Sequence, residues 1–279
     1  MSANSVQGID VSHYQGKIDW GKVKSAGMAF AFTKATESTN STDSQFSVNW
    51  PAIKAAGLLR GAYHFFHADQ DATAQANFFL QVTDIGPGDL PAVIDIETTS
   101  NASDSAIVSG VQTWLNVVQQ ATGIVPMIYT AGSFWNAHLN SSFGNYPLWV
   151  ANYGVTTPKL PTGWNNWNFW QYSQSGTVSG ISGNVDMDYF NGSLAQLNAF
   201  VGSSQTSQPT PDINSSDADN STASTGGGGG GGYTYVVKSG DTLDGIAASF
   251  NTTAAELQQA NRIQNPNDIQ VGQILTIPS

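Results

Sequence analysis

The 279-residue chain contains no cysteine and little positive charge. Without cysteine it has no disulfides, thiolate nucleophile or Cys-based zinc site. Nine Lys and Arg against 20 Asp and Glu give a net charge of −11, so no basic patch for nucleic acid or an anionic membrane can form. No apolar run approaches the roughly 20 residues of a membrane helix. We therefore expect a neutral or cationic partner, with no nucleic acid, membrane or cofactor.

Aromatic residues, in contrast, are plentiful. They make up 11% of the chain and include eight Trp, while only 10% of residues are charged. This balance is typical of proteins that handle sugars, whose aromatic faces stack on pyranose rings. The alternative is a large aromatic core, and most of these rings are expected to serve that purpose.

Export is an expectation rather than a visible signal. The segment Met1-Ser2-Ala3-Asn4 does not read as a signal peptide. Asn-x-Ser/Thr sequons are frequent and fit a secreted product. We expect an extracellular protein whose leader was removed, with export by a phage-type route as the alternative.

A change in composition divides the chain. Residues 202–232 have almost no large apolar side chains and end in seven glycines, Gly226 to Gly232. Such a segment cannot bury enough surface to fold. We predict a first domain over residues 1–202, a flexible linker over 203–232 and a small domain over 233–279.

Short apolar runs bounded by turn residues predict strands in the first domain. They are Val6–Asp10, Met28–Thr33, Leu58–His64, Ala92–Glu97, Pro126–Thr130, Leu148–Asn152, Phe169–Tyr172 and Val185–Asp188. Helices are predicted between the early ones, at Asp19–Ala26, Ser44–Ala56, Ala72–Val82 and Ser103–Ala121. This alternation indicates a parallel α/β sheet. Because helices become short or vanish after Thr130, we expect an irregular (β/α) barrel that lacks helices in its second half.

The clearest chemical signal lies in the predicted strand that contains Asp95 and Glu97. Side chains at i and i+2 of a strand point to one face, about 6.6 Å apart. Two carboxyl groups at that spacing resist ionising together, so one keeps its proton near neutral pH. Glycoside hydrolysis needs this acid and anion. The alternative is a pair of solvated acids at a strand end.

The motifs of the first domain resemble family 25 glycoside hydrolases. In order, they are Gly8-Ile9-Asp10-Val11-Ser12-His13-Tyr14-Gln15-Gly16, Phe32-Thr33-Lys34-Ala35-Thr36-Glu37, Gly61-Ala62-Tyr63-His64-Phe65, Asp95-Ile96-Glu97, Leu148-Trp149-Val150-Ala151-Asn152-Tyr153, Trp170-Gln171-Tyr172-Ser173 and Val185-Asp186. The resemblance covers nearly all of residues 5–200. It implies a lysozyme (N-acetylmuramidase) that cleaves, with net retention, the β-1,4 bond between N-acetylmuramic acid and N-acetylglucosamine in bacterial peptidoglycan.

The resemblance also assigns the site. Glu97 matches the proton donor, and Asp95, Asp10 and Asp186 match the other active-site acids. We expect Asp95 to orient the substrate's 2-acetamido group, with direct attack by a carboxylate as the alternative. Further positions could line a sugar cleft or pack in the core: Lys34, Tyr63, Tyr129, Trp149 and Gln171.

The last 47 residues are predicted to fold as β-α-α-β and resemble a LysM domain, a module that binds N-acetylglucosamine-containing glycans. The resemblance rests on Tyr235-Val236-Val237-Lys238-Ser239-Gly240-Asp241-Thr242-Leu243 and Val271-Gly272-Gln273-Ile274-Leu275-Thr276-Ile277-Pro278. Its implied groove residues are Gly240, Asp241, Thr242, Leu243, Pro266, Asn267 and Ile269. The two resemblances point to one polymer.

Two alternatives and two further expectations accompany this interpretation. The chain could be a catalytically silent peptidoglycan- or chitin-binding protein, or a hydrolase that acts on chitin. His64 and His67 are spaced i, i+3 without a supporting ligand pattern, so we expect no metal site. We expect a monomer.

Overall fold

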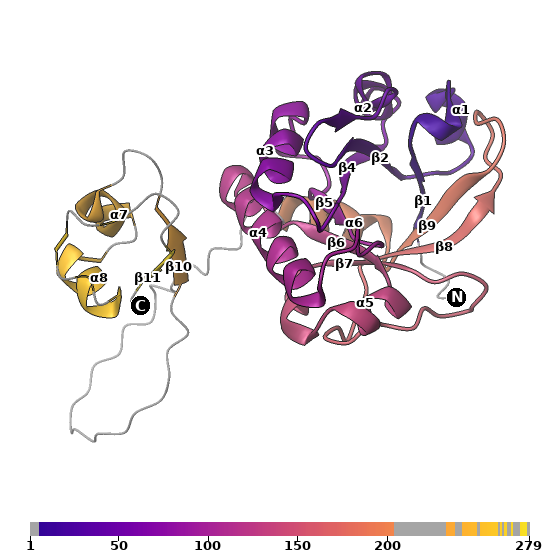
Figure 1. Ribbon diagram of the computed structural model, residues 1–279. Helices are drawn as coiled ribbons and strands as arrows, with labels where there is room; N and C mark the ends of the chain where they lie inside the picture. Colours follow the sequence, from indigo (N-terminus) through magenta and orange to yellow (C-terminus); the bar gives the residue numbers. More distant parts are fainter. Residues whose placement is uncertain are drawn as a thin grey trace, which may run out of the picture. The chain divides into compact units, whose positions relative to one another are not determined.

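The computed structural model describes residues 6–203, 233–237, 242–249, 252–261, 263, 265–266, 269 and 274–277. The chain divides into two compact units, Met1–Pro211 and Asp212–Ser279 (Figure 1). No helix among these residues is long and apolar enough to cross a membrane.

Strands of the first unit close into a barrel, which confirms the α/β barrel prediction. In the order β1-β9-β8-β7-β6-β5-β4-β2 each pairs with the next, and β1 pairs back to β2. Their bounds are β1 (Val6–Val11), β2 (Phe30–Glu37), β4 (Leu59–Phe65), β5 (Val93–Asp95), β6 (Met127–Ala131), β7 (Leu148–Ala151), β8 (Phe169–Gly176) and β9 (Val185–Phe190). A short strand that was not predicted, β3 (Ser41–Thr42), pairs antiparallel with the end of β2.

The prediction of an all-parallel sheet is wrong at the last strand. β9 runs antiparallel to both β8 and β1. The connection of residues 177–184 contains no helix. A parallel return needs a long crossover, whereas a short connection turns the chain back antiparallel. The turn places the acids of β9 opposite those of β1.

The helices on the outside of the barrel are α1 (Trp20–Ser25), α2 (Phe46–Ala55), α3 (Ala72–Val82), α4 (Asp104–Thr122), α5 (Gly132–His138) and α6 (Leu194–Ser203). Two short 3₁₀ helices are η1 (His13–Gln15) and η2 (Ser141–Phe143). The side chains of Asp19, Asp71 and Ser103 accept N-cap hydrogen bonds from α1, α3 and α4, as short polar side chains do at helix starts. No helix separates β7 from β8, in agreement with the irregular second half.

Aromatic rings fill the bottom of the barrel. Phe30 and Phe32 alternate with outward residues along β2 and pack against Trp149 and Phe169. A Cβ at Gly61 would lie 2.3 Å from Phe32 Cδ1, so only glycine leaves room for the ring. These rings therefore close one end of the barrel, and the other end, here called the upper end, is open and carries the polar residues.

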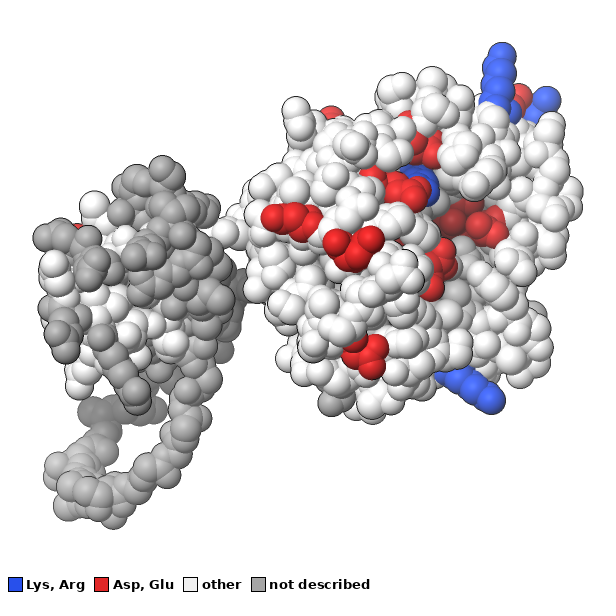
Figure 2. All heavy atoms as spheres, in the orientation of Figure 1, with Lys and Arg blue, Asp and Glu red and all other residues white. Residues whose placement is uncertain are grey.

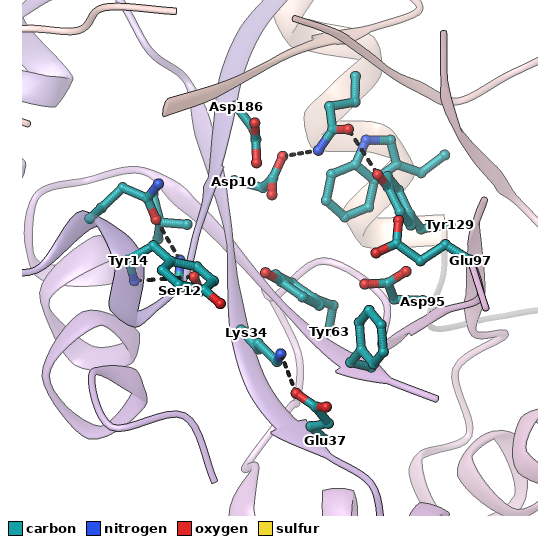
Figure 3. Close-up of a pocket in the computed structure, with 15 residues that line it drawn as sticks. Asp10, Ser12, Tyr14, Lys34, Glu37, Tyr63, Asp95, Glu97, Tyr129 and Asp186 are labelled. Carbon is teal, nitrogen blue, oxygen red and sulfur yellow. Dashed lines mark hydrogen bonds and ion pairs between the residues drawn. The ribbon is translucent and has the colours of Figure 1, made fainter. Parts of the chain in front are cut away.

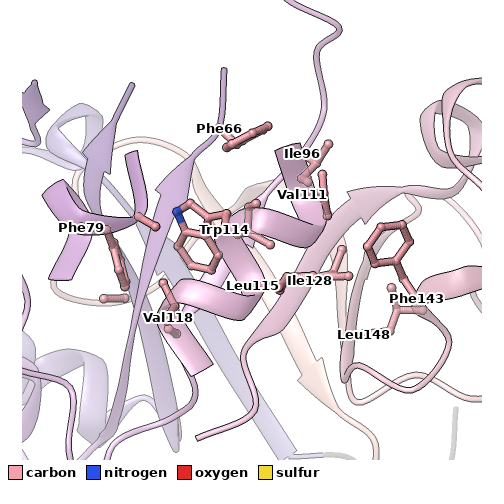
Figure 4. Packing of buried hydrophobic residues seen from close by; sticks show 14 of the residues in the cluster. Phe66, Phe79, Ile96, Val111, Trp114, Leu115, Val118, Ile128, Phe143 and Leu148 are labelled. Atoms are coloured by element: carbon pink, nitrogen blue, oxygen red, sulfur yellow. The ribbon is translucent and has the colours of Figure 1, made fainter. Parts of the chain in front are cut away.

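A second apolar layer joins the helices to the barrel wall. Trp114 of α4 is fully buried beside Phe79 of α3, and Ile128 of β6 belongs to the same cluster (Figure 4). Buried aromatic and aliphatic groups of this kind supply most of a domain's stability. This layer fixes the strands whose ends carry the site.

The second unit has the predicted β-α-α-β order. Its elements are β10 (Tyr233–Val236), α7 (Leu243–Ser249), α8 (Ala254–Asn261) and β11 (Ile274–Ile277). β10 and β11 pair antiparallel. A small core that includes Leu243, Leu257 and Leu275 is buried among these elements.

Candidate active site

A cavity of about 400 Å³ opens at the upper end of the barrel. It is lined by all nine site residues predicted in the first domain: Asp10, Lys34, Tyr63, Asp95, Glu97, Tyr129, Trp149, Gln171 and Asp186. Acidic side chains gather around this hollow with a basic group among them (Figure 2). The roles predicted for these residues stay predictions, but their side chains meet in one place.

Asp95 and Glu97 do not share a strand, contrary to the prediction. β5 ends at Asp95, and Glu97 follows in the loop. The connecting residue Ile96 is held to β6, because its N–H donates to Tyr129 O at 3.0 Å and its carbonyl accepts from Thr130 Oγ1 at 2.8 Å. Asp95 is 6% exposed, whereas Glu97 is exposed. The structure therefore separates a buried acid from a reachable one.

The surroundings of this pair shift both pKa values upward. Burial and then the neighbouring Glu97 charge raise the pKa of Asp95 well above its usual value, although Lys34 opposes the shift. Although the Glu97 side chain is exposed overall, the surrounding protein removes water from its carboxyl group, which raises the pKa of Glu97, again opposed by Lys34. Asp95 Oδ1 is buried and has no hydrogen-bond partner among the described residues. It is an acceptor left free for a ligand.

A second acid cluster links β1 to β9. Asp10 is the cross-strand partner of Asp186, and Asp188 lies two residues further along. Asp188 is fully buried, and its Oδ2 has no hydrogen-bond partner among the described residues. Burial, followed by the charges of Asp188 and Asp186, raises the pKa of Asp10 well above its usual value. Burial also raises the pKa of Asp186, to about 6.

Neutral side chains connect the acids. Gln171 Nε2 donates to Asp10 Oδ2 at 2.7 Å, and Gln171 Oε1 accepts from Tyr129 Oη at 2.8 Å and from the Tyr153 hydroxyl. Trp149 Nε1 donates to Asp188 Oδ1 at 2.8 Å. This network holds the carboxyl groups in place.

Three of the predicted sugar contacts are mostly part of the barrel interior. Trp149 is 1% exposed, Gln171 3% and Tyr129 7%. Trp149 also stacks on Phe32, with ring centroids 4.4 Å apart. Their edges reach the cavity, but Trp149 has no open face for a sugar ring. Core packing is the better description of the Trp149 ring.

Lys34 is the one cation among the described residues that line the cavity. Its Nζ pairs with Glu37 Oε2 at 2.6 Å (Figure 3). Glu37 Oε1 contacts His67 Nε2 at 2.9 Å. Nζ also lies 4.9 Å from the centroid of the Phe65 ring. This chain of contacts keeps a positive charge close to Asp95 and Glu97.

His64 has a structural role. Its Nδ1 contacts Thr36 Oγ1 at 2.7 Å and its Nε2 contacts Gln75 Oε1 at 3.1 Å. Burial lowers its pKa to about 4. No group of three or more His, Asp or Glu side chains suited to a metal is found among the described residues.

The predicted groove residues of the second unit are only partly described. Gly240, Asp241 and Asn267 lie outside the described residues. Leu243 is 1% exposed, so its side chain packs in the core rather than lining a surface groove. Thr242 and Pro266 are exposed, and Ile269 is half-buried.

Sequence reasoning overlooked several residues near the cavity. Glu37 and Tyr14 line it, and Asp188 lies below Asp10. Asp188 could have been found, because it follows Asp186 at the i, i+2 spacing that drew attention to Asp95 and Glu97. No sequence signal marks the ion pair of Glu37 with Lys34.

A closed α/β barrel that brings a buried and a reachable carboxyl group to one cavity has the acid and the anion that glycoside hydrolysis requires. The model of glycosyl hydrolases family 25 matches residues 9–181, and the LysM domain model matches residues 235–278. The first match spans more than half of the chain. The chain therefore belongs to glycosyl hydrolases family 25 and carries a LysM domain.

Relatives named as lysozymes agree with the family assignment. Lysozyme M1 from Streptomyces globisporus is 44% identical over 211 residues, covering 71% of this chain and 72% of that protein. The crystal structure of the bacterial lysozyme from Streptomyces coelicolor superposes with a TM-score of 0.70 at 40% identity, covering 73% of this chain and all of that one. This chain is also 58% identical over 44 residues to the N-acetylmuramoyl-L-alanine amidase XlyA from Bacillus subtilis. The match covers 16% of this chain and 15% of that protein.

Proposed function

We propose that this enzyme is a lysozyme that hydrolyses the β-1,4 bond between N-acetylmuramic acid and N-acetylglucosamine in bacterial peptidoglycan. The observation that carries the proposal is the Asp95–Glu97 pair, a buried and a reachable carboxyl group with raised pKa values at one cavity. Relatives that carry the names Lysozyme M1 and N,O-diacetylmuramidase support the same proposal.

The positions of the two carboxyl groups support different roles for them. Glu97 is exposed and can reach the oxygen of the leaving sugar, so it serves as the general acid. Its raised pKa keeps it protonated at higher pH than an ordinary glutamate. Asp95 is buried with a free Oδ1, which suits it to accept a hydrogen bond from the N–H of the 2-acetamido group.

The proposed reaction then proceeds in two steps. The acetamido oxygen attacks C1 while the glycosidic C–O bond breaks, and Glu97 gives its proton to the leaving oxygen. A water molecule then attacks C1 from the opposite side, Glu97 takes up the water's proton, and the acetamido group is restored. Two inversions give net retention. Asp10 and Asp186 hold the charge and hydrogen bonds of the opposite wall.

The roles are tested by two isosteric variants on insoluble cell walls. Glu97→Gln should abolish turnover, since no proton reaches the leaving oxygen; loss of a general acid costs about 10²–10⁴-fold. Asp95→Asn should slow turnover strongly, because the amide no longer fixes the acetamido N–H. Unchanged turnover in Asp95→Asn, with none in Glu97→Gln, would show that the Asp95 role is wrong.

The LysM domain supports a second part of the proposal, namely that the second unit binds the same glycan. A tethered binding unit raises the local concentration of the catalytic unit at an insoluble polymer. We also propose that the enzyme acts outside the cell that makes it and is a monomer. Its proposed parts are a catalytic domain over residues 1–202, a linker over 203–232 and a glycan-binding domain over 233–279. The location of peptidoglycan and the composition of the linker support these proposals.

A further inference from the structure

Tyr14 is an exposed ring at the mouth of the cavity. It is 83% exposed and belongs to the lining. Figure 3 shows it on the side of the pocket opposite Asp95, Glu97 and Tyr129. Single exposed apolar side chains are ordinary on protein surfaces, so exposure alone assigns nothing to Tyr14. The way in which its backbone is held is more informative.

The turn that carries Tyr14 is fixed by reciprocal hydrogen bonds. Ser12 Oγ accepts from Tyr14 N–H at 3.3 Å, and Gln15 Oε1 accepts from Ser12 N–H at 2.9 Å. Gln15 Nε2 also donates to the carbonyl of Asn184 at 3.3 Å, which ties the turn to the segment before β9. Gly16 ends the turn at a φ of 58°, a conformation that favours glycine.

A buried carboxylate supports the same turn from below. Asp43 Oδ2 accepts from the backbone N–H of His13 at 3.0 Å and contacts His13 Nδ1 at 2.7 Å. Its side chain is completely buried. The His13 ring lies against Tyr14, with centroids 4.1 Å apart. Holding the ring in place before binding reduces the entropy that a ligand must overcome.

The polar lining of the cavity and the proposed reaction indicate what Tyr14 receives. Asp10, Asp95, Glu97 and Asp186 line the cavity, with Lys34 as the one cation among the described lining residues. The proposed cleavage places N-acetylmuramic acid at the reacting centre, so the next ring, across the cleaved bond, is N-acetylglucosamine. An uncharged pyranose ring offers apolar C–H bonds to an aromatic face and hydroxyls to the surrounding acids.

We propose that Tyr14 is the platform of a subsite that binds an N-acetylglucosamine ring next to the sugar at the reacting centre. The inference rests on the proposed lysozyme function and adds a specific contact to it. Tyr14 contributes its ring face, and the turn of residues 12–16 contributes its position. Binding there aligns the glycan strand without taking part in bond cleavage.

The test compares three variants of the full-length enzyme, Tyr14→Ala, Tyr14→Phe and Tyr14→Trp. The readouts are KM and kcat on labelled peptidoglycan fragments, and the Ki of glycan strands stripped of their peptides, used as competitive inhibitors. Tyr14→Ala should raise KM and Ki by ~10-fold, which corresponds to about 1.4 kcal/mol, without changing kcat. Tyr14→Phe and Tyr14→Trp should stay near the wild type.

Val48→Ala is the matched control, since Val48 is 57% exposed on α2 and does not line the cavity. An unchanged KM and Ki in Tyr14→Ala would overturn the subsite. So would an equal loss in Tyr14→Phe, which would point to the hydroxyl, or an effect on KM with no effect on the stripped strands, which would point to the peptide. If the wild type does not cleave the fragments, the lysozyme proposal itself fails.

Discussion

At the scale of single residues, Lys34 sets the charge balance of the site. It lowers the pKa values of Asp95 and Glu97, against the upward effect of burial. Activity needs a protonated Glu97 and an Asp95 that can accept a hydrogen bond from the acetamido N–H. The dependence of kcat/KM on pH should therefore be bell-shaped. Its limbs belong to the coupled pair rather than to either residue.

Lys34→Met should move the bell-shaped pH profile of kcat/KM to higher pH. Without the cation both carboxyl pKa values rise, so Glu97 loses its proton only at a higher pH and the ascending limb moves in the same direction. The measurement is kcat/KM on soluble fragments across the pH range. Lys159→Met is the control, because Lys159 is exposed away from the cavity. A bell that stays in place or moves to lower pH would contradict this account.

Asp188 illustrates the cost of burying acids. Burial raises its folded-state pKa and those of Asp10 and Asp186. Folding therefore binds protons on this cluster, and its contribution to stability falls as pH rises from the ordinary Asp pKa of 3.8. For Asp186 this fall is complete a little above its pKa of about 6.

Asp188→Asn should gain stability relative to the wild type as the pH rises from about 4 to about 7, since it removes one of these titrating groups. The amide oxygen still accepts from Trp149 Nε1, the donor to Asp188 Oδ1 in the wild type. Urea unfolding at several pH values measures the difference. Asp19→Asn, at an exposed acid whose pKa is lowered by its N-cap bonds, should not gain. A constant difference across pH for Asp188→Asn would contradict the burial argument.

At the scale of elements, alternation and turn residues predicted the barrel strands well. The strand that contains Phe30 and Phe32 was found because its side chains alternate between two apolar environments. Helix α5 was missed because Ala131 at its N-cap makes no side-chain hydrogen bond. The direction of β9 was predicted wrongly because parallel strands were inferred from the alternation of strands and helices. The short connection before β9 was not considered.

The site was predictable to a similar degree. Acids at strand ends converge in any α/β barrel, so Asp10, Asp95, Glu97 and Asp186 could be grouped before the structure. Burial could not be predicted: Trp149 turned out to be a core ring whose N–H is bonded to Asp188. Contacts such as Glu37 with Lys34 and Asp43 with His13 depend on loop conformation, for which the sequence has no periodic signal.

Gly61 on β4 tests the packing beneath the site. Gly61→Ala places a Cβ 2.3 Å from Phe32 Cδ1 and should lower the free energy of unfolding by about 1–3 kcal/mol. Gly21→Ala in α1, whose Cβ would lie 3.4 Å from Asp19 Oδ1, should be neutral or stabilising by up to ~1 kcal/mol. Chemical denaturation measures both. Equal stability of the two variants would mean that the barrel interior can relax around Phe32.

At the scale of the whole molecule, two units with separate cores share one polymer. Deleting residues 204–279 should weaken binding to insoluble walls by about 10²-fold or more. Cleavage of small soluble fragments should remain unchanged, because the cavity lies wholly within the first unit. Pelleting assays and fragment kinetics measure the two effects. Equal losses in both assays would show that the units do not act independently.

The identity of the bond that is cut tests the central claim most directly. Purified peptidoglycan is digested with the enzyme, and the reducing-end sugars of the products are identified by mass spectrometry, with Glu97→Gln as the control. Cleavage of the proposed bond leaves new reducing ends that are N-acetylmuramic acid in the wild-type digest and none in the control. Reducing ends that are N-acetylglucosamine, or no new reducing ends in the wild-type digest, would contradict it.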